Sequence, residues 1–162
     1  MDPQVRRAGT ADLAELPGIE AAADTLFLPL GIGDLPAPAT ADERARAWRV
    51  LVAGRPVGGF AVLDRLGDDV HLEQLSVHPA LGRRGLGSAL LAAVVDEATL
   101  AGARRVTLTT YADIAWNAPF YARHGWRELD DLTPALASIR AHETALGLDR
   151  HGRRVVMARP VA

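Results

Sequence analysis

The chain has 162 residues, a length that predicts a single domain (residues 1–162) with one sizeable core. Its content of 49% hydrophobic and 23% charged residues excludes disordered and fibrous proteins. All 18 basic residues are arginine and cysteine is absent, which excludes disulfides, thiolate metal sites, cysteine nucleophiles and lysine-based chemistry. The net charge of −2 offers no positive field to nucleic acid, which we do not expect as a partner.

Secretion and membrane insertion are not expected either. The N-terminal sequence MDPQVRRAGTADLAEL lacks the long apolar run of a secretory signal. The longest apolar run elsewhere, near Ala89–Val95, is far shorter than the ~20 residues of a membrane-spanning helix. We therefore expect a cytoplasmic protein without membrane partners.

The first elements in chain order are a strand and a helix. Gln4–Arg7 predicts a short strand, and Thr10 is the expected N-cap of a helix that continues through Ile19. Repeated proline and glycine over Leu26–Thr40 predict a loop with at most a short helix, of a length that often carries function.

An antiparallel meander is predicted next. Its strands are Trp48–Ala53, Pro56–Asp64 and Val70–Val77, with a tight hairpin at Gly54-Arg55 and a bulge at Gly58-Gly59. Alternation along the third strand places one set of side chains on a common face, namely His71, Glu73, Leu75 and Val77.

The rest of the chain predicts a βαβ unit and three further elements. A helix follows with its inner face formed by Leu86, Leu90, Leu91, Val94, Val95 and Ala98. The strand Arg105–Thr110 then completes the βαβ unit. The remaining elements are expected at Ala118–Arg123 (helix), Trp126–Leu129 (strand), Pro134–Leu146 (helix) and Arg153–Arg159 (strand). The predicted fold class is α/β, with a mixed, mostly antiparallel central sheet flanked by helices.

The most informative segment is LSVHPALGRRGLGSALL, residues 75–91, which reads as strand, Gly- and Arg-rich turn and helix start. Glycines permit close backbone approach, unpaired N–H groups at a helix start favour an anion, and Arg83 and Arg84 add positive charge. The segment therefore predicts a phosphate-binding loop. It matches neither a Walker loop nor a dinucleotide-binding fingerprint, although a nucleotide-binding domain is kept as a weaker hypothesis.

This segment resembles the acyl-CoA-binding motif of the GNAT N-acetyltransferases, which is usually Gln/Arg-x-x-Gly-x-Gly/Ala. Gly85 and Gly87 occupy its two glycine positions, whereas Gly82 stands in place of Gln or Arg and Arg83 in place of a common glycine. A second segment, NAPFYARHGW at residues 117–126, resembles the family's Asn-Tyr-Gly-Phe/Trp segment. The two segments follow in the family's order, and the predicted elements match its layout over nearly the whole chain.

The resemblance implies a GNAT-like sheet that opens between the strands ending at Val77 and Thr110, with acetyl-CoA as cosubstrate in the opening. In this family the backbone amides corresponding to Arg83–Ser88 bind the pyrophosphate. Asn117 would bind the pantetheine or order its loop, and Ser88 would cap the helix or contact phosphate. The residues assigned to acetyl-CoA are Leu75, Ser76, Val77, Arg83, Arg84, Gly85, Leu86, Gly87, Ser88, Asn117 and Tyr121.

The implied reaction is direct attack of a primary amine on the thioester. An alkylamine has a pKa of ~10.4, so a base, or a water bound to one, is useful at pH 7. Glu73 is the first candidate base and His71 the alternative, each with a purely structural reading: a solvated or ion-paired carboxylate, and a strand-edge histidine. Tyr121 stands where the family places the acid that protonates the thiolate; otherwise it is a core tyrosine.

The acceptor is not identified from sequence. By resemblance, the loop Phe27–Pro38 and the helix carrying Glu20 and Asp24 would line its site, although Leu26, Phe27 and Leu28 are equally compatible with burial in the core. His142 and Glu143 either face the acceptor or are surface charge. Small-molecule and peptide amines are both compatible acceptors. A non-catalytic acyl-CoA-binding or regulatory module of the same fold is the alternative function.

The histidines lack ligand spacing, so no metal is expected. A homodimer is compatible with the sequence, with the strand Arg153–Arg159 as an exposed edge that contributes to it.

Overall fold

The computed structural model describes residues 4–161. Seven strands form one sheet in the order β1-β2-β3-β4-β5-β7-β6, in which β4 and β5 are the parallel pair. The strands are β1 (Val5–Arg7), β2 (Arg49–Ala53), β3 (Gly59–Leu66), β4 (Asp69–Val77), β5 (Arg105–Tyr111), β6 (Arg127–Glu128) and β7 (Arg154–Pro160). The helices are α1 (Thr10–Leu13), α2 (Leu16–Asp24), α3 (Ala41–Ala45), α4 (Leu86–Leu100), α5 (Ala118–Arg123) and α6 (Pro134–Ala145), with 3₁₀ turns η1 (Thr25–Leu30), η2 (Pro79–Leu81) and η3 (Leu148–His151). The expected α/β fold with a mostly antiparallel sheet is confirmed.

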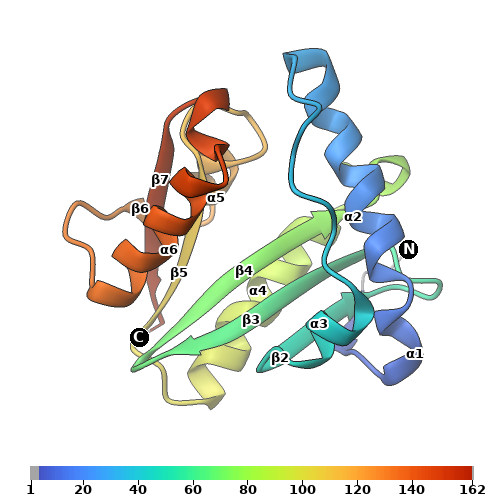
Figure 1. Cartoon of the computed structure of the whole chain (residues 1–162). Coiled ribbons are helices and arrows are strands. Elements are labelled where there is room, and N and C mark those ends of the chain that lie inside the picture. The colour runs from blue at the N-terminus through green and yellow to red at the C-terminus, as the bar shows by residue number, and fades with distance from the viewer. Residues whose placement is uncertain (1–3, 162) are drawn as a thin grey trace.

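Helices cover both faces of the sheet (Figure 1). On one face α4 packs on β2, β3 and β4, and its buried side chains are Leu86, Leu90, Leu91, Val94 and Ala98. The sequence predicted this apolar face because the residues recur at helical spacing. On the other face α2 inserts Leu16 and Ile19 against Phe60 and Val62 of β3. None of the helices within residues 4–161 combines the length and the apolar run that crossing a membrane requires.

Two local predictions in the first half of the chain were wrong. The helix predicted from Thr10 through Ile19 is divided into α1 and α2, because Pro17 lies at the start of α2, where its missing N–H costs nothing. Thr10 is the first residue of α1, and Gly9 is the N-cap. The Gly9 amide donates to the Asp12 carboxylate at 2.7 Å, so the side chain that closes this helix end lies three residues downstream.

The predicted bulge is also displaced. Gly59 pairs regularly with Val77, and the irregularity lies further along, where Val62 pairs with Gln74 but Leu63 pairs with Leu72. Glu73 is therefore the extra residue of a β-bulge in β4. A bulge shifts the alternation of side chains by one position. The prediction of one common face for four residues was wrong: Leu75 and Val77 pack on the α4 side, whereas Glu73 contacts α3 on the opposite side.

The strand expected as an exposed edge is an interior strand. β7 pairs with β5 along its whole length and with β6 through Ala158 and Met157. The short β6 lies outside β7 because the chain turns back at Gly125 after α5. The middle of the β7 edge, from Val156 to Ala158, is therefore covered by the segment of β6.

Candidate active site

A cleft opens where β4 and β5 separate. The two strands pair at Val70 with Val106 and at His71 with Thr107, and no pair follows before either strand ends. They start side by side and diverge toward their C-terminal ends (Figure 1). The resulting cleft has a volume of about 1410 Å³ and is lined from both strands. The predicted opening between the strands ending near Val77 and Thr110 is confirmed.

One half of the cleft, which we call the cofactor half, is formed by the end of β4, the following loop and the start of α4. The N-cap of α4 is Gly85 with φ of 82°, and none of the side chains that the structure describes caps the helix. The first amides of a helix have no partner within it, so the amides of Leu86, Gly87 and Ser88 can donate to an anion at this end. A Cβ on Gly87 would lie 3.3 Å from Cζ of Phe120, so this glycine also permits the close approach of α5.

The two departures from the family motif have different local geometries. Gly82 is extended, with φ of −61° and ψ of 154°, a conformation that any residue adopts. Arg83 has φ of 62°, the left-handed region that favours glycine. The arginine at the position where glycine is common therefore adopts a glycine-like backbone at an energetic cost.

The structure brings nearly all the predicted site residues into this one cleft. Those that line it are Glu73, Leu75, Ser76, Val77, Arg83, Gly85, Leu86, Gly87, Ser88, Asn117 and Tyr121. Arg84 lies in the loop but does not line the cleft, so its contact with a cofactor stays a prediction. The grouping arises because the loop after β4 and the segment after β5 leave adjacent strands at the same end of the sheet.

The side chain of Asn117 organises the loop after β5. Its Oδ1 accepts a hydrogen bond from Oγ1 of Thr110 at 2.7 Å and another from the amide of Tyr111 at 3.3 Å. The expected loop-ordering role therefore has a geometric basis. On the opposite wall, Oγ of Ser88 is 3.2 Å from Nε2 of His124, which links the start of α4 to the end of α5.

Tyr121 lies between the cleft and the core. Its ring packs edge-on against Phe120 and Trp126, at centroid distances of 5.4 Å and 6.1 Å. Burial raises the pKa of its phenol above the ordinary value, so the hydroxyl is protonated at neutral pH. Packing against Phe120 and Trp126 agrees with the reading as a core tyrosine, and a place in the lining of the cleft agrees with the reading as an acid, which stays a prediction.

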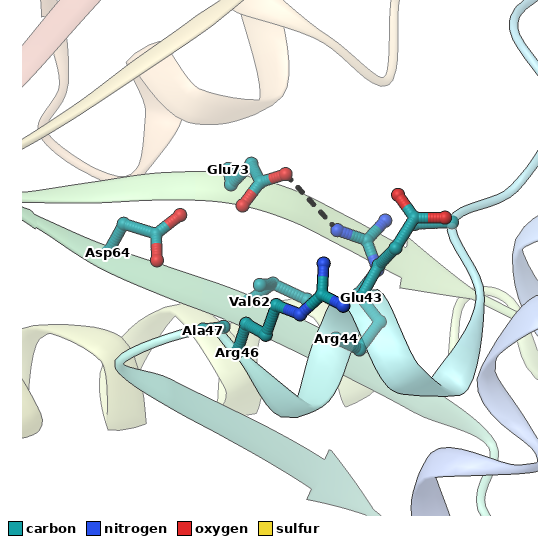
Figure 2. Close-up of a pocket in the computed structure, with 8 residues that line it drawn as sticks. Glu43, Arg44, Arg46, Ala47, Val62, Asp64 and Glu73 are labelled. Carbon is teal, nitrogen blue, oxygen red and sulfur yellow. Dashed lines mark hydrogen bonds and ion pairs between the residues drawn. The ribbon is translucent and has the colours of Figure 1, made fainter.

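Glu73 occupies the bulge and points to the α3 side of the sheet, into a pocket of about 270 Å³ that adjoins the main cleft (Figure 2). One oxygen of its carboxylate accepts a hydrogen bond from Arg44 at 3.3 Å, and Asp64 faces it from β3. Burial, followed by the proximity of Asp64, raises its pKa to about 7, while Arg44 opposes the rise. A carboxylate with this pKa is matched to proton transfer at neutral pH.

His71 is in a different environment from Glu73. It lies in the middle of the sheet, paired with Asp64 on one side and Thr107 on the other, so the reading as a strand-edge histidine was wrong. Its Nδ1 is 2.8 Å from Oγ1 of Thr107. Burial lowers its pKa to about 4. The imidazole is neutral at pH 7 and a weaker base than Glu73, so the geometry favours the glutamate.

Arg44 is the principal site residue that the sequence analysis missed. Its guanidinium is buried and donates to Glu20 of α2 at 2.8 Å as well as to Glu73. The capping box of α3, in which Thr40 and Glu43 bond reciprocally, fixes the short helix that carries it. This capping pattern was the available sequence signal for α3; the partners of Arg44 come from elements distant in the chain.

The far end of the cleft, which we call the acceptor half, is bounded by α2, η1 and the loop to α3 on one side and by α6 on the other (Figure 1). Glu143 of α6 lines the cleft and accepts hydrogen bonds from Thr109 of β5 and Arg154 of β7. Its side chain is therefore held in place in the cleft and is not a solvated surface charge. The alternative in which the apolar residues of η1 are buried in the core was wrong for Leu26 and Leu28, which are 42% and 57% exposed.

Metal ligation finds no support in the described part of the chain. Within residues 4–161 no three His, Asp or Glu side chains come together in a way that suits a metal ion. Individual histidines have other partners: Nδ1 of His78 accepts from the Ala80 amide, and Nε2 of His151 lies 2.7 Å from Asp34.

Comparison with known proteins identifies the family to which the chain is similar. The model of a family described as an acetyltransferase (GNAT) domain matches residues 45–128, just over half of the chain. A mycothiol acetyltransferase from Kineococcus radiotolerans is 38% identical over 95 residues, which cover 57% of this chain. The chain spans only 28% of the length of that relative.

Solved structures agree over the whole fold. The ribosomal-protein-S18-alanine N-acetyltransferase of Escherichia coli matches with a TM-score of 0.69 at 21% identity, covering 98% of this chain and 94% of that one. The PaiA N-acetyltransferase of Thermoplasma acidophilum, solved in complex with coenzyme A, matches with a TM-score of 0.71 at 14% identity, covering 99% of each chain. The family match and the shared fold agree with the open sheet and the glycine-rich loop: the chain belongs to the GNAT acetyltransferase family.

Proposed function

We propose that the protein is an acetyl-CoA-dependent N-acetyltransferase that acts by direct attack of a primary amine on the thioester in a ternary complex. The observation that carries the proposal is one continuous cleft with an uncapped helix start at one end and a carboxylate of raised pKa, that of Glu73 on β4, in its lining. An anion-binding end and a proton acceptor are the two features that this reaction requires of the protein.

The residues that line the cofactor half suit coenzyme A, which carries the acetyl group. The first-turn amides of α4 and the side chain of Arg83 suit a pyrophosphate, because both present hydrogen-bond donors with positive character. Leu75 and Val77, at the end of β4 just before the loop, line the cleft and suit an apolar linker. Asn117 has its Oδ1 engaged by Thr110, which leaves its amide nitrogen to donate toward the cleft.

In the proposed reaction the acceptor nitrogen bonds to the acetyl carbonyl carbon, and the bond from that carbon to sulfur breaks. Glu73 takes the proton that the acceptor ammonium loses before attack, directly or through an ordered water, and the second proton, which the nitrogen loses as the amide forms, passes to solvent. Tyr121 gives a proton to the departing thiolate and regains one from solvent, to which Glu73 releases its own. Arg44 holds the Glu73 carboxylate in place. Burial raises the pKa of Glu73, which makes this carboxylate a stronger base.

The test is thiol release from acetyl-CoA with a panel of primary amines, for the native chain and for Glu73→Gln and Tyr121→Phe. General acid or base catalysis contributes about 10²–10⁴-fold, so each variant should lose turnover on that scale while retaining acetyl-CoA affinity in calorimetry. A native chain that binds acetyl-CoA but releases no thiol with any amine would identify a non-catalytic acyl-CoA-binding module instead.

A further inference from the structure

The walls of the acceptor half are apolar. Leu26 of η1, Trp116 before α5 and Leu146 after α6 line the cleft and are 42%, 39% and 48% exposed. Large apolar side chains at this exposure are uncommon as a group on a soluble surface and mark a binding site when they line a cleft. Additional apolar lining residues in this half are Phe27, Leu35, Pro36, Ile139 and Leu148.

The two walls are joined across the acceptor half. Phe27 packs edge-on against Trp116 at a centroid distance of 5.4 Å, which connects η1 to the segment after β5. Asp34, in the loop after η1, accepts a hydrogen bond from Arg150 at 2.8 Å and pairs with His151 at 2.7 Å, both in η3. These bridges between the separated arms enclose the acceptor half and favour a small molecule over an extended peptide.

The inner end of the acceptor half is lined by carboxylates. Glu20 and Asp24 of α2 reach it from one side, and Asp64 and Glu73 from the sheet. Burial and the charge of Glu20 raise the pKa of Asp24 to about 6, as expected for carboxylates placed close together without enough cations. A ligand ammonium would supply the missing positive charge.

The arginines of the acceptor half are already paired. Arg44 donates to Glu20 and Glu73, and Arg154 donates to Glu143 at 3.1 Å. His71 is neutral at pH 7, which leaves His142 as the remaining basic side chain among the described residues that line this half. Arg46 lines the adjoining pocket, where it lies beside Asp64 and Glu73. Among the described residues that line the acceptor half of the cleft itself, a carboxylate on the acceptor would find no free guanidinium and would face Glu20, Asp24, Asp64 and Glu73 instead.

We propose that the acceptor is a small primary amine on an apolar body, without a carboxylate beside the amine. The proposal rests on the proposed acetyltransferase function and names its substrate class. The ammonium lies toward the carboxylates at the inner end, where Glu73 removes its proton, and the apolar body lies between η1 and the end of α6.

The experiment compares acceptors that differ in one feature, with thiol release as the readout. Phenethylamine and phenylalanine differ by the carboxylate, and hexylamine and ethanolamine differ in the polarity of the body. We expect kcat/KM to be at least tenfold higher for phenethylamine than for phenylalanine, and for hexylamine than for ethanolamine. Phenylalanine or ethanolamine performing as well as its partner would overturn the proposal and leave the transferase function intact.

Two variants tie this preference to the apolar walls. Leu26→Ser and Leu146→Ser should raise KM for phenethylamine about three- to tenfold without changing KM for acetyl-CoA. Leu100→Ser is the matched control, because Leu100 is 80% exposed at the end of α4 and does not line the cleft. If Leu26→Ser and Leu146→Ser left KM for phenethylamine unchanged, as Leu100→Ser should, this result would contradict the placement of the apolar body against these walls. Absence of thiol release with every amine would instead overturn the proposed function itself, and this inference with it.

Discussion

The two halves of the cleft are built in opposite ways. The cofactor half comes mostly from one continuous segment, the end of β4, the loop and the start of α4, and it offers backbone amides and an arginine. The acceptor half is assembled from α2, η1, α3, the β4 bulge and α6, and it offers side-chain carboxylates and apolar walls. A phosphate can be bound by a local backbone conformation, whereas a specific amine requires side chains gathered from several elements.

This difference predicts that substitutions in the acceptor half will damage both folding and chemistry, whereas those in the cofactor half will mainly change affinity.

The largest expected effect on stability comes from Arg44→Leu. Removing one partner of a buried ion pair leaves an uncompensated charge on Glu20 and typically costs about 3–5 kcal/mol. Denaturant unfolding should show this loss. Arg46→Leu, at the exposed C-cap residue of the same helix, is the control and should change stability by no more than about 0.5 kcal/mol. Equal stability of the two variants would show that the Arg44 ion pair is not a structural link.

Acetyl-CoA should stabilise the chain without any substitution. A ligand at 100 times its Kd contributes about 2.7 kcal/mol, which for a chain of this size raises the midpoint of thermal unfolding by roughly 5–11 °C. ATP and NAD serve as controls and should produce much smaller shifts. A larger shift with either nucleotide than with acetyl-CoA would make the loop after β4 a nucleotide site.

Ionisation of Glu73 should appear in the pH dependence of kcat/KM. The base acts when deprotonated, and its pKa is raised to about 7, so activity is lost as the pH falls below that value. Between pH 6 and pH 8 the ratio of native to Glu73→Gln activity should rise about tenfold, and taking the ratio cancels the ionisation of the amine. A ratio that does not vary with pH would contradict the assignment of Glu73 as the base.

The smallest expected effect is at Arg83, where two substitutions distinguish the role of the side-chain charge from that of the backbone conformation. Both Arg83→Gly and Arg83→Ala remove the guanidinium, but only glycine adopts φ of 62° without strain. We expect the glycine variant to be more stable than the alanine variant by about 1 kcal/mol, while both lose acetyl-CoA affinity to the same extent. Equal stability of the two variants would mean that the loop relaxes away from the left-handed conformation.

The sequence by itself determined the elements whose signals are local. The helical spacing of apolar residues predicted α4, and the glycines around its start and the segment from Asn117 to Trp126 carried the family resemblance that implied the open sheet and the cofactor half. These signals survive without tertiary context because backbone conformation and periodicity depend on neighbouring residues.

Only the tertiary structure decided the acceptor half. No glycine or proline marks the bulge at Glu73, because the bulge depends on how β3 and β4 pair. The bulge in turn places Leu75 and Val77 on the opposite face from the one predicted. The partners of Arg44 come from α2 and β4, and their pairing arises only after the sheet and helices have packed. The charge balance of the acceptor half follows from that packing, because burial and proximity, which set the pKa of Glu73, are properties of the folded chain.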